Sequence, residues 1–423
     1  MNRSHMHVRN LKSRLFLYIG IFLMIFLSQP YVVFLTHKNA AYRVASDPAK
    51  QIAAVQEGFI GREICLPILG IIGAISLFRR TGEKLSVRGI TAGIMVFFFL
   101  WACLSVVWAD DTMLTAKRLL VLILLCLGAL AIAKHFSLLE ITEAIFVSGA
   151  LTAVISLVQN CVMGTFHPLD PQYRFGGAMH PNDQGICFGL FFLSAIALAE
   201  RPTRKRCLYF FTTIIALIFL ILTKSRAAFL SAVFAVSIYK YLRQSRKAVI
   251  GAIMFIIICI CVSYLLLGDD LLSYIQKGLF LGRTNQSVGT LNSRLPLWQE
   301  CAMYFSRRPI FGYGYNAFWT AHHYARISAD LDWGMGSAHN GYIDLILGVG
   351  VVGAGAFIIA MILAIVKAGA LSMEFASSDY AIACAILIYI LLSNLFESVL
   401  LLPHMATFFL YTLLLKIGFV KYR

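Results

Sequence analysis

A chain of 423 residues is long enough for two or three soluble domains, but its composition excludes them. Hydrophobic residues make up 60% of the chain and charged residues only 13%, about half the charged fraction of soluble proteins. The net charge of +16 does not indicate a nucleic-acid-binding protein, because the basic residues lie in short loops between apolar runs and form no basic stripe. The ten cysteines include no Cys-x-x-Cys pair, so neither a zinc site nor a disulfide framework is predicted.

Long apolar runs predict an all-α polytopic membrane protein with about twelve transmembrane helices. A helix needs about 20 apolar residues to cross a bilayer. The first run follows a basic N-terminal segment but is too long for a signal peptide, so we interpret it as a retained helix. The seventh and eighth runs flank one short turn and could be a single span, although that span would be too long for a bilayer. The predicted spans are 15–36, 60–78, 89–108, 118–133, 139–160, 183–199, 208–223, 227–242, 248–268, 339–366, 379–398 and 402–418.

The distribution of basic residues predicts the orientation of these spans. Lys and Arg are dense in the short loops 79–88, 200–207 and 240–247 and in the tail 416–423. Short basic loops face the cytoplasm in inner-membrane proteins. Both termini are therefore expected on the cytoplasmic side of a bacterial inner membrane.

The same orientation divides the chain into three parts. Nine spans are expected over 1–267, and three more over 339–423. Between them, 268–338 is expected to form one large periplasmic loop containing short helices, one of them amphipathic. Loops of this length are usually functional or disordered, and three tryptophans in this one indicate order.

Polar and ionisable side chains gather at the outer ends of the spans, whereas the middle of the spans is nearly free of charge. Because charge inside a bilayer is costly and usually marks function, this pattern predicts a site at the outer mouth of the bundle. The group includes Arg174, His180, Asn182, Lys224, Arg226, Arg294, His339, Asn340 and Glu397.

Arg226 and Arg294 are the candidate anion-binding residues. Arg226 follows Lys224 in the short turn TKSR, where an arginine that anchors the helix at the membrane interface is an equally good interpretation. Arg294 is expected at the start of an amphipathic helix on the bilayer surface or over the bundle, capped by Asn292 or Ser293, with Pro296 in its first turn. A helix N-terminus and a forked guanidinium group both suit a phosphate or diphosphate.

His339 is the candidate general base. It lies where the large loop re-enters the membrane in the sequence SAHNGYIDLILGVGVVG. A histidine at such a boundary is more often a hydrogen-bonded structural residue, but its ordinary pKa suits general-base catalysis. Upstream, RRPIFGYGYNAFW, which contains Tyr313, predicts a tight turn.

These segments together resemble the O-antigen ligase and Wzy-type polymerase superfamily of bacterial surface-polysaccharide enzymes. The matching pieces are RFGGAMHPNDQG, TKSRA, SRLPLW, the P-x-x-G-x-G of 309–314 and AHNGYIDLILGVGVVG. Each is weak alone, but their order, spacing and shared outer location are more specific. The resemblance covers about 174–366, and the rest of the chain agrees only in hydropathy.

The resemblance implies a multi-spanning, GT-C-like glycosyltransferase that uses a glycan on undecaprenyl diphosphate, with no cofactor and no metal. In this chain Arg226 and Arg294 match the arginines that hold the donor diphosphate, and His339 matches the histidine that activates the acceptor hydroxyl. The remaining matched positions are candidate substrate-binding residues with less clear roles: Arg174, His180, Asn182, Lys224, Asn340 and Tyr313.

Four functions stay open: a polymerase, a ligase, a transporter or flippase, and a scaffold. GYGYNAFW and HPNDQG resemble exopolysaccharide polymerases, which add a growing chain to another lipid-linked repeat unit. A ligase would instead transfer the polymer to lipid A-core. A transporter or flippase would be expected to show repeated halves and polar groups near the midplane, and a non-enzymatic scaffold would not need two arginines and a histidine at one site.

Overall fold

The computed structural model describes residues 15, 17–27, 60–79, 85–87, 89–170, 173–177, 179–243, 289–331 and 336–419. Within these ranges every regular element is a helix. A short apolar helix covers Leu17–Leu27, and a 3-10 turn covers Ser105–Val107. The α-helices are α4 Ile60–Phe78, α5 Ile90–Leu104, α6 Thr112–His135, α7 Leu138–Val162, α8 Pro181–Ala199, α9 Arg206–Leu222, α10 Arg226–Arg243, α12 Gly289–Arg307, α13 Ala321–Leu331, α14 Gly341–Glu374, α15 Ser378–Ser393 and α16 Met405–Phe419.

The all-helical prediction is confirmed for the described residues, and the predicted spans within them fall on helices. Six segments are long and apolar enough to cross a membrane: Gly61–Phe78, Ile90–Val107, Thr112–His135, Leu138–Val162, Pro181–Ala199 and Gly341–Glu374. The runs at 208–223 and 227–242 are two separate helices, α9 and α10. The predicted span 248–268 lies outside the described residues, so the total of about twelve stays a prediction.

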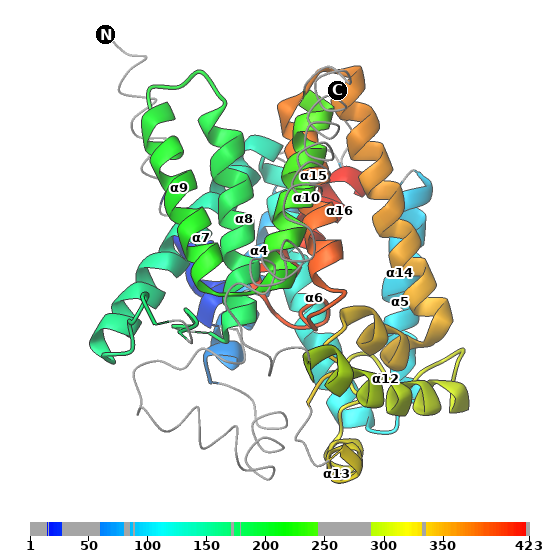
Figure 1. Cartoon of the computed structure of the whole chain (residues 1–423). Coiled ribbons are helices and arrows are strands. Elements are labelled where there is room, and N and C mark those ends of the chain that lie inside the picture. Colours follow the sequence, from blue (N-terminus) through cyan, green and yellow to red (C-terminus); the bar gives the residue numbers. More distant parts are fainter. Residues whose placement is uncertain are drawn as a thin grey trace, which may run out of the picture.

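Most of these helices stand side by side as one bundle (Figure 1). At its centre α16 is buried along its whole length, and α8 is buried at most of its positions. The outer helices instead expose large apolar side chains, such as Ile71 and Ile75 on α4 and Phe211 and Ile218 on α9. Apolar residues therefore fill both the core and the outer face of the bundle. This is expected when lipid, and not water, surrounds the bundle.

Basic side chains close one end of the bundle. Lys134 donates to the carbonyl oxygens of Leu77 and Arg79, each at 2.7 Å, and Lys416 donates to that of Phe136 at 2.7 Å. Lysines near helix C-termini satisfy carbonyl groups that lack a partner within the helix. These bonds bring the start of the basic loop 79–88, Lys134 and Lys416 of the basic tail together at one end of the bundle.

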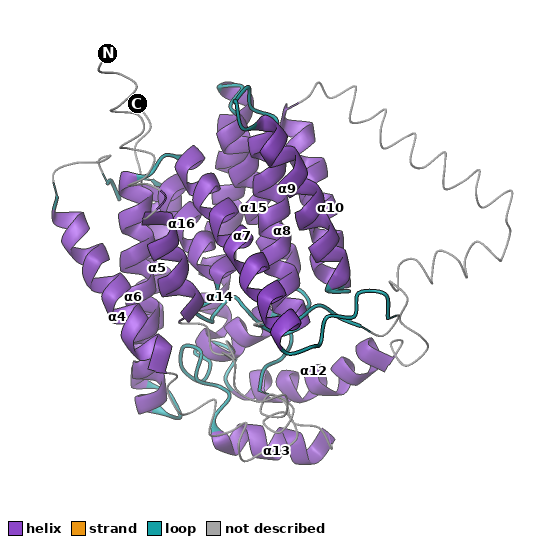
Figure 2. Ribbon diagram, turned by 90° about the vertical axis from the view of Figure 1, so that its left-hand side faces the viewer, coloured by secondary structure: helices purple, strands orange, loops and turns teal. Residues whose placement is uncertain are grey.

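The opposite end carries the large loop. Figures 1 and 2 show α12 lying across the ends of the upright helices, with α13 beneath it. This agrees with the expectation of a helix packed over the bundle. The buried side chains Leu297 and Cys301 of α12 join Tyr313, Phe318 and other residues in an aromatic cluster below α14.

The predicted start of α12 is wrong. The helix begins at Gly289, before Asn292 and Ser293, so neither residue caps it and Pro296 lies inside the helix. A proline inside a helix lacks the N–H that would bond to the carbonyl group four residues earlier, and its ring crowds that turn. The helix can nevertheless continue on the N-terminal side of the proline, as it does here. Arg294 consequently lies beyond the first turn, where the helix N-terminus contributes little to anion binding.

The predicted end of the span 379–398 is also wrong. The helix α15 stops at Ser393, and Asn394 ends it by donating from Nδ2 to the carbonyl oxygen of Ile390 at 2.8 Å. The Oδ1 atom of Asn394 accepts the backbone N–H of Val399 at 3.3 Å. These bonds hold the chain from residue 394 to α16 in an irregular conformation, although its sequence is as apolar as a span.

The long helix α14 is broken at Gly350, where φ is 67° and ψ is −178°. The loop that follows α12 completes the hydrogen bonds there. The N–H groups of Tyr313 and Gly314 donate to the carbonyl oxygens of Leu347 and Gly348 at 2.8 and 2.9 Å, and the N–H of Val351 donates to that of Pro309 at 2.8 Å. The glycine-rich motif thereby fixes α12 against the first part of α14.

Candidate functional site

The candidate site lies at the α12 end of the bundle, where the starts of α8, α10 and α14 meet α12 and the 394–404 segment. The turn between α9 and α10 consists of Thr223, Lys224 and Ser225. Lys224 adopts a φ of 51°, and Thr223 Oγ1 accepts the N–H of Ser225 at 3.2 Å. The turn is thus as tight as predicted, and it delivers Arg226 at the first position of α10.

The segment before α8 docks onto this turn. Phe175 donates its N–H to the carbonyl oxygen of Leu222 at 2.9 Å, and Arg174 Nε donates to that of Thr223 at 3.2 Å. The other end of the Arg174 guanidinium group donates to Asn182 Oδ1 at 2.5 Å. Arg174 therefore ties the α9–α10 turn to the first turn of α8.

The start of α8 explains the local pattern His-Pro-Asn. His180 is the N-cap, and its Nδ1 accepts the N–H of Asn182 at 3.3 Å. Pro181 takes the first helical position, where its missing N–H costs nothing. Asn182 then donates from Nδ2 to Glu397 Oε1 at 2.6 Å.

Arg294 reaches the same carboxylate from α12. Its Nη1 donates to the carbonyl oxygen of Phe396 at 2.9 Å, and its Nη2 lies 3.7 Å from Glu397 Oε1. Glu397 is only 7% exposed. Arg174, Asn182, Glu397 and Arg294 thus form a chain of polar contacts that joins three separate segments.

The start of α14 lies against the same segment. Asn340 caps the helix by accepting the N–H groups of Tyr342 and Ile343 on Oδ1, at 3.0 and 3.2 Å. The N–H of Gly341 donates to the carbonyl oxygens of Asn394 and Glu397 at 2.9 and 3.0 Å. His339, just before the cap, has a φ of 48°, a conformation that costs energy for a residue with a side chain.

His339 is buried, and its pKa responds to the charge of Arg294. Burial, then the positive charge of Arg294 and the nearby His180, lower the pKa of His339 from 6.5 to about 4. His339 is therefore neutral at physiological pH. Burial, then the positive charge of Arg294, also lower the pKa of Arg226, so the charge of Arg294 acts on both Arg226 and His339.

Glu397 belongs to the outer polar group predicted from the sequence, but sequence reasoning gave it no role of its own. Burial and the nearby Asp183 raise the pKa of Glu397 to about 8, although Arg294, Arg174 and the amide of Asn182 act in the opposite direction. The available signal was a single carboxylate within the apolar stretch LSNLFESVLLL. Its role was missed because that stretch was expected to be helix.

The structure does not bring Tyr313 into this group of side chains. Tyr313 is 4% exposed, its hydroxyl donates to the carbonyl oxygen of Tyr304 at 2.7 Å, and its ring lies under Arg308. It packs in the aromatic cluster below α14 and contributes the N–H that bonds to Leu347. Its predicted contact with substrate stays a prediction, and the geometry gives it a supporting position.

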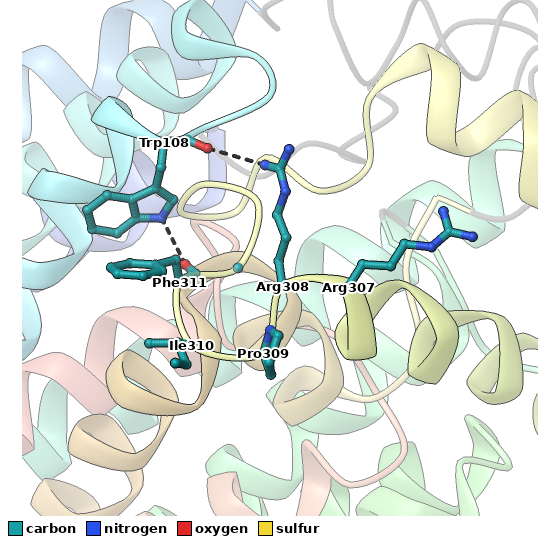
Figure 3. A pocket seen from close by; sticks show the side chains of 7 residues that line it. Trp108, Arg307, Arg308, Pro309, Ile310 and Phe311 are labelled. Carbon is teal, nitrogen blue, oxygen red and sulfur yellow. Dashed lines mark hydrogen bonds between the residues drawn. The ribbon is translucent and has the colours of Figure 1, made fainter.

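A separate depression lies on the flank of the loop, lined by Trp108 and residues 307–312 (Figure 3). Arg308 donates to the carbonyl oxygen of Trp108 at 3.3 Å and pairs with Asp110 at 2.6 Å. Trp108 donates from Nε1 to the carbonyl oxygen of Phe311 at 2.9 Å. The predicted site residues take no part in its lining.

Within the described ranges, no group of three or more His, Cys, Asp or Glu residues is arranged to hold a metal ion. The charged groups that converge at the site are instead guanidinium groups, one from α10, one from α12 and one from the segment before α8. Such a set can bind an anion with several oxygen atoms by charge and by forked hydrogen bonds.

Comparison with known proteins bears on this arrangement. Residues 211–358 match the model of a family described as O-antigen ligase. The matched region runs from α9 into α14 and so contains Arg226, Arg294 and His339. A search of curated proteins finds no match for the chain.

Proposed function

We propose that the chain, of which residues 211–358 match the O-antigen ligase family, is a member of the O-antigen ligase and Wzy-type superfamily and a glycosyltransferase that transfers a glycan from undecaprenyl diphosphate to a sugar hydroxyl. The family supports an O-antigen ligase- or polymerase-type enzyme that acts on lipid-linked polysaccharide in a membrane. The finer assignment rests on the resemblance and on the geometry of the site.

One observation carries the proposal: the charge of Arg294, on α12, acts both on Arg226, at the start of α10, and on the neutral His339, before α14. A lipid-linked glycan presents its anomeric carbon at the membrane surface next to two negatively charged phosphates. Two arginines held by the fold can bind those phosphates and stabilise the charge that develops as the diphosphate leaves. Their guanidinium groups would take the electrostatic role that a divalent cation has in many other transferases.

His339 supplies the matching base. Its neutral imidazole takes the proton of the acceptor hydroxyl as that oxygen forms a bond to the anomeric carbon. The bond from this carbon to the diphosphate oxygen breaks on the opposite face, so the configuration inverts. The products are the extended glycan and undecaprenyl diphosphate, and the preformed diphosphate ester supplies the energy.

The remaining predicted residues receive supporting roles. Arg174 and Asn182 orient Glu397 and Arg294, and His180 caps α8 beside His339. Lys224 adds positive charge in the turn before Arg226, and Asn340 fixes the start of α14. Tyr313 is proposed to act through α14, because its N–H bonds to that helix.

Between the two reactions of the superfamily we propose polymerisation. The segments GYGYNAFW and HPNDQG resemble those of exopolysaccharide polymerases, in which the acceptor is a second lipid-linked repeat unit. Transfer to lipid A-core is the alternative. The polar groups at the end of the bundle, far from the midplane, do not favour a transporter.

The proposed location is a bacterial inner membrane, within a GT-C-like arrangement of about twelve spans. The lysine-capped end of the bundle would face the cytoplasm with both termini, in accordance with the positive-inside rule. The site at the α12 end would then face the periplasm, where lipid-linked repeat units are available and ATP is not.

Product analysis with the purified protein in nanodiscs tests the proposal. The donor is undecaprenyl-diphosphate-linked oligosaccharide, supplied alone or together with lipid A-core, and His339→Ala is the control. A ladder of longer lipid-linked glycans from the donor alone supports a polymerase, and product only with lipid A-core supports a ligase. No product from a folded protein with its native donor would overturn the enzyme and favour a transporter.

A further inference from the structure

The buried carboxylate of Glu397 occupies the place where the proposed function puts a diphosphate. Its Oε1 atom is shared by Asn182 Nδ2 at 2.6 Å and Arg294 Nη2 at 3.7 Å. Both donors belong to the polar chain that joins α8 to α12. An anion bound by Arg294 would therefore meet an acidic group that already faces the same guanidinium group, and the two would repel each other wherever that group is ionised.

The protein around Glu397 does not let this side chain move away easily. The neighbouring carbonyl oxygen of Phe396 accepts Arg294 Nη1 at 2.9 Å, and the carbonyl oxygen of Glu397 itself accepts the N–H of Gly341 at 3.0 Å. The backbone at 396–397 is thus tied both to α12 and to the start of α14. Relief of the repulsion must come mainly from a change of charge.

We propose that Glu397 is a positioning residue that, where it is ionised in the empty enzyme, holds Arg294 as a carboxylate and takes up one proton when the donor diphosphate binds. The proton comes from water, and no bond other than the O–H bond of the carboxyl group is formed. The protonated Glu397 then donates a hydrogen bond instead of repelling the phosphates. This inference rests on the proposed function, because it assumes that the anion at Arg294 is a diphosphate.

The charged groups around Glu397 favour this exchange. Arg294 on α12 and Arg174 before α8 stabilise the carboxylate, whereas Asp183 on α8 destabilises it. The charge of Arg294 also acts on Arg226 on α10 and on the neutral His339 before α14. A bound diphosphate would neutralise the arginines and leave Asp183 unopposed, so the pKa of Glu397 would rise above its present value of about 8.

Calorimetry tests the proton uptake directly. Wild-type protein and Glu397→Gln in nanodiscs are titrated with undecaprenyl-diphosphate-linked N-acetylglucosamine, a diester whose phosphates stay ionised throughout. Each titration is repeated in two buffers of different ionisation enthalpy, at a pH well above and a pH well below 8. The difference between buffers counts the protons taken up on binding.

The wild type is expected to take up close to one proton per bound donor at the higher pH and almost none at the lower pH. Glu397→Gln, which mimics the protonated acid, should bind without uptake and with an affinity that no longer falls as the pH rises. Asp379→Asn is the matched control. Asp379, in the first turn of α15, also pairs with an arginine, but this arginine is Arg201, which follows the C-terminal end of α8 and takes no part in the candidate site. It should behave like the wild type.

The outcomes separate the two ideas. Binding of the donor with the same proton uptake in Glu397→Gln and wild type would overturn the role of Glu397 and leave the donor site intact. Uptake that disappears in His339→Ala but persists in Glu397→Gln would assign the proton to the histidine instead. A folded wild type that does not bind the diester would overturn the proposed donor site, and the present inference with it.

Discussion

Replacement of Gly350 by alanine tests whether the break in α14 organises the site. At φ 67° and ψ −178° the backbone occupies a region open almost only to glycine, and a side chain there costs about 1–3 kcal/mol. The added Cβ would also overlap the carbonyl oxygen of Ile310. The loop 309–314 must therefore move away from α14.

That movement would break up to three hydrogen bonds, those from Tyr313 to Leu347, from Gly314 to Gly348 and from Val351 to Pro309. Each contributes about 0.5–1.5 kcal/mol, so the total loss including strain is roughly 2.5–7.5 kcal/mol. Arg294 precedes this loop on α12, and His339 precedes α14. A shift between the two should therefore also lower transfer.

Thermal unfolding of the purified protein in detergent is the assay, with transfer measured on the same samples. Gly355→Ala is the matched control in the same helix, because no atom lies within 4 Å of its added Cβ. Alanine is favoured over glycine in a helix by up to about 1 kcal/mol, so this control should keep or raise the Tm. A Tm for Gly350→Ala equal to that of Gly355→Ala would refute the reasoning.

Three further predictions concern the site. Arg226→Ala and Arg294→Ala should each abolish transfer, by at least about a hundredfold, while membrane insertion and Tm stay close to those of the wild type; wild-type rates in either variant would contradict the diphosphate role. The kcat/KM for transfer should rise with pH through about 4, where His339 loses its proton, and the corresponding limb of kcat should lie at higher pH because a bound diphosphate offsets the charge of Arg294; a limb of kcat/KM at 6.5 would contradict the buried, arginine-flanked histidine. Asn340→Ala should cost about 0.5–2 kcal/mol through loss of the α14 cap, whereas Asn340→Asp, which keeps the acceptor oxygen, should retain most of the stability; equal Tm values for the two variants would argue against the cap.

Much of the fold follows from local features of the chain. Apolar runs of helical length predict spanning helices because a bilayer leaves no water for an open backbone. Local capping is equally readable. Ser137 and Glu140 form a capping box at the start of α7, and His180 with Pro181 starts α8, so these helix starts depend only on neighbouring residues.

Sequence reasoning also selected the residues that matter most for the proposed chemistry. Arg226, Arg294 and His339 were singled out by their outer position and by the segments in which they lie. The structure adds that the charge of Arg294 acts on both of the others. Sequence reasoning expected these residues to share one end of the bundle. It did not predict the contacts of Arg294 with the carbonyl oxygen of Phe396 and with Glu397.

The tertiary structure decided the features that depend on distant segments. The helix α15 ends at Ser393 because Asn394 bonds to the following loop and to Gly341, and α14 bends at Gly350 because residues 309–314 supply the missing hydrogen bonds. Glu397 reaches Asn182, which lies 215 residues earlier in the chain. Hydropathy reports the free energy of placing a segment in lipid, and it contains no information about hydrogen bonds between segments so far apart. The chain alone therefore indicated a multi-pass membrane protein and predicted which end carries the candidate site, whereas only the packed bundle decided which charges face one another there.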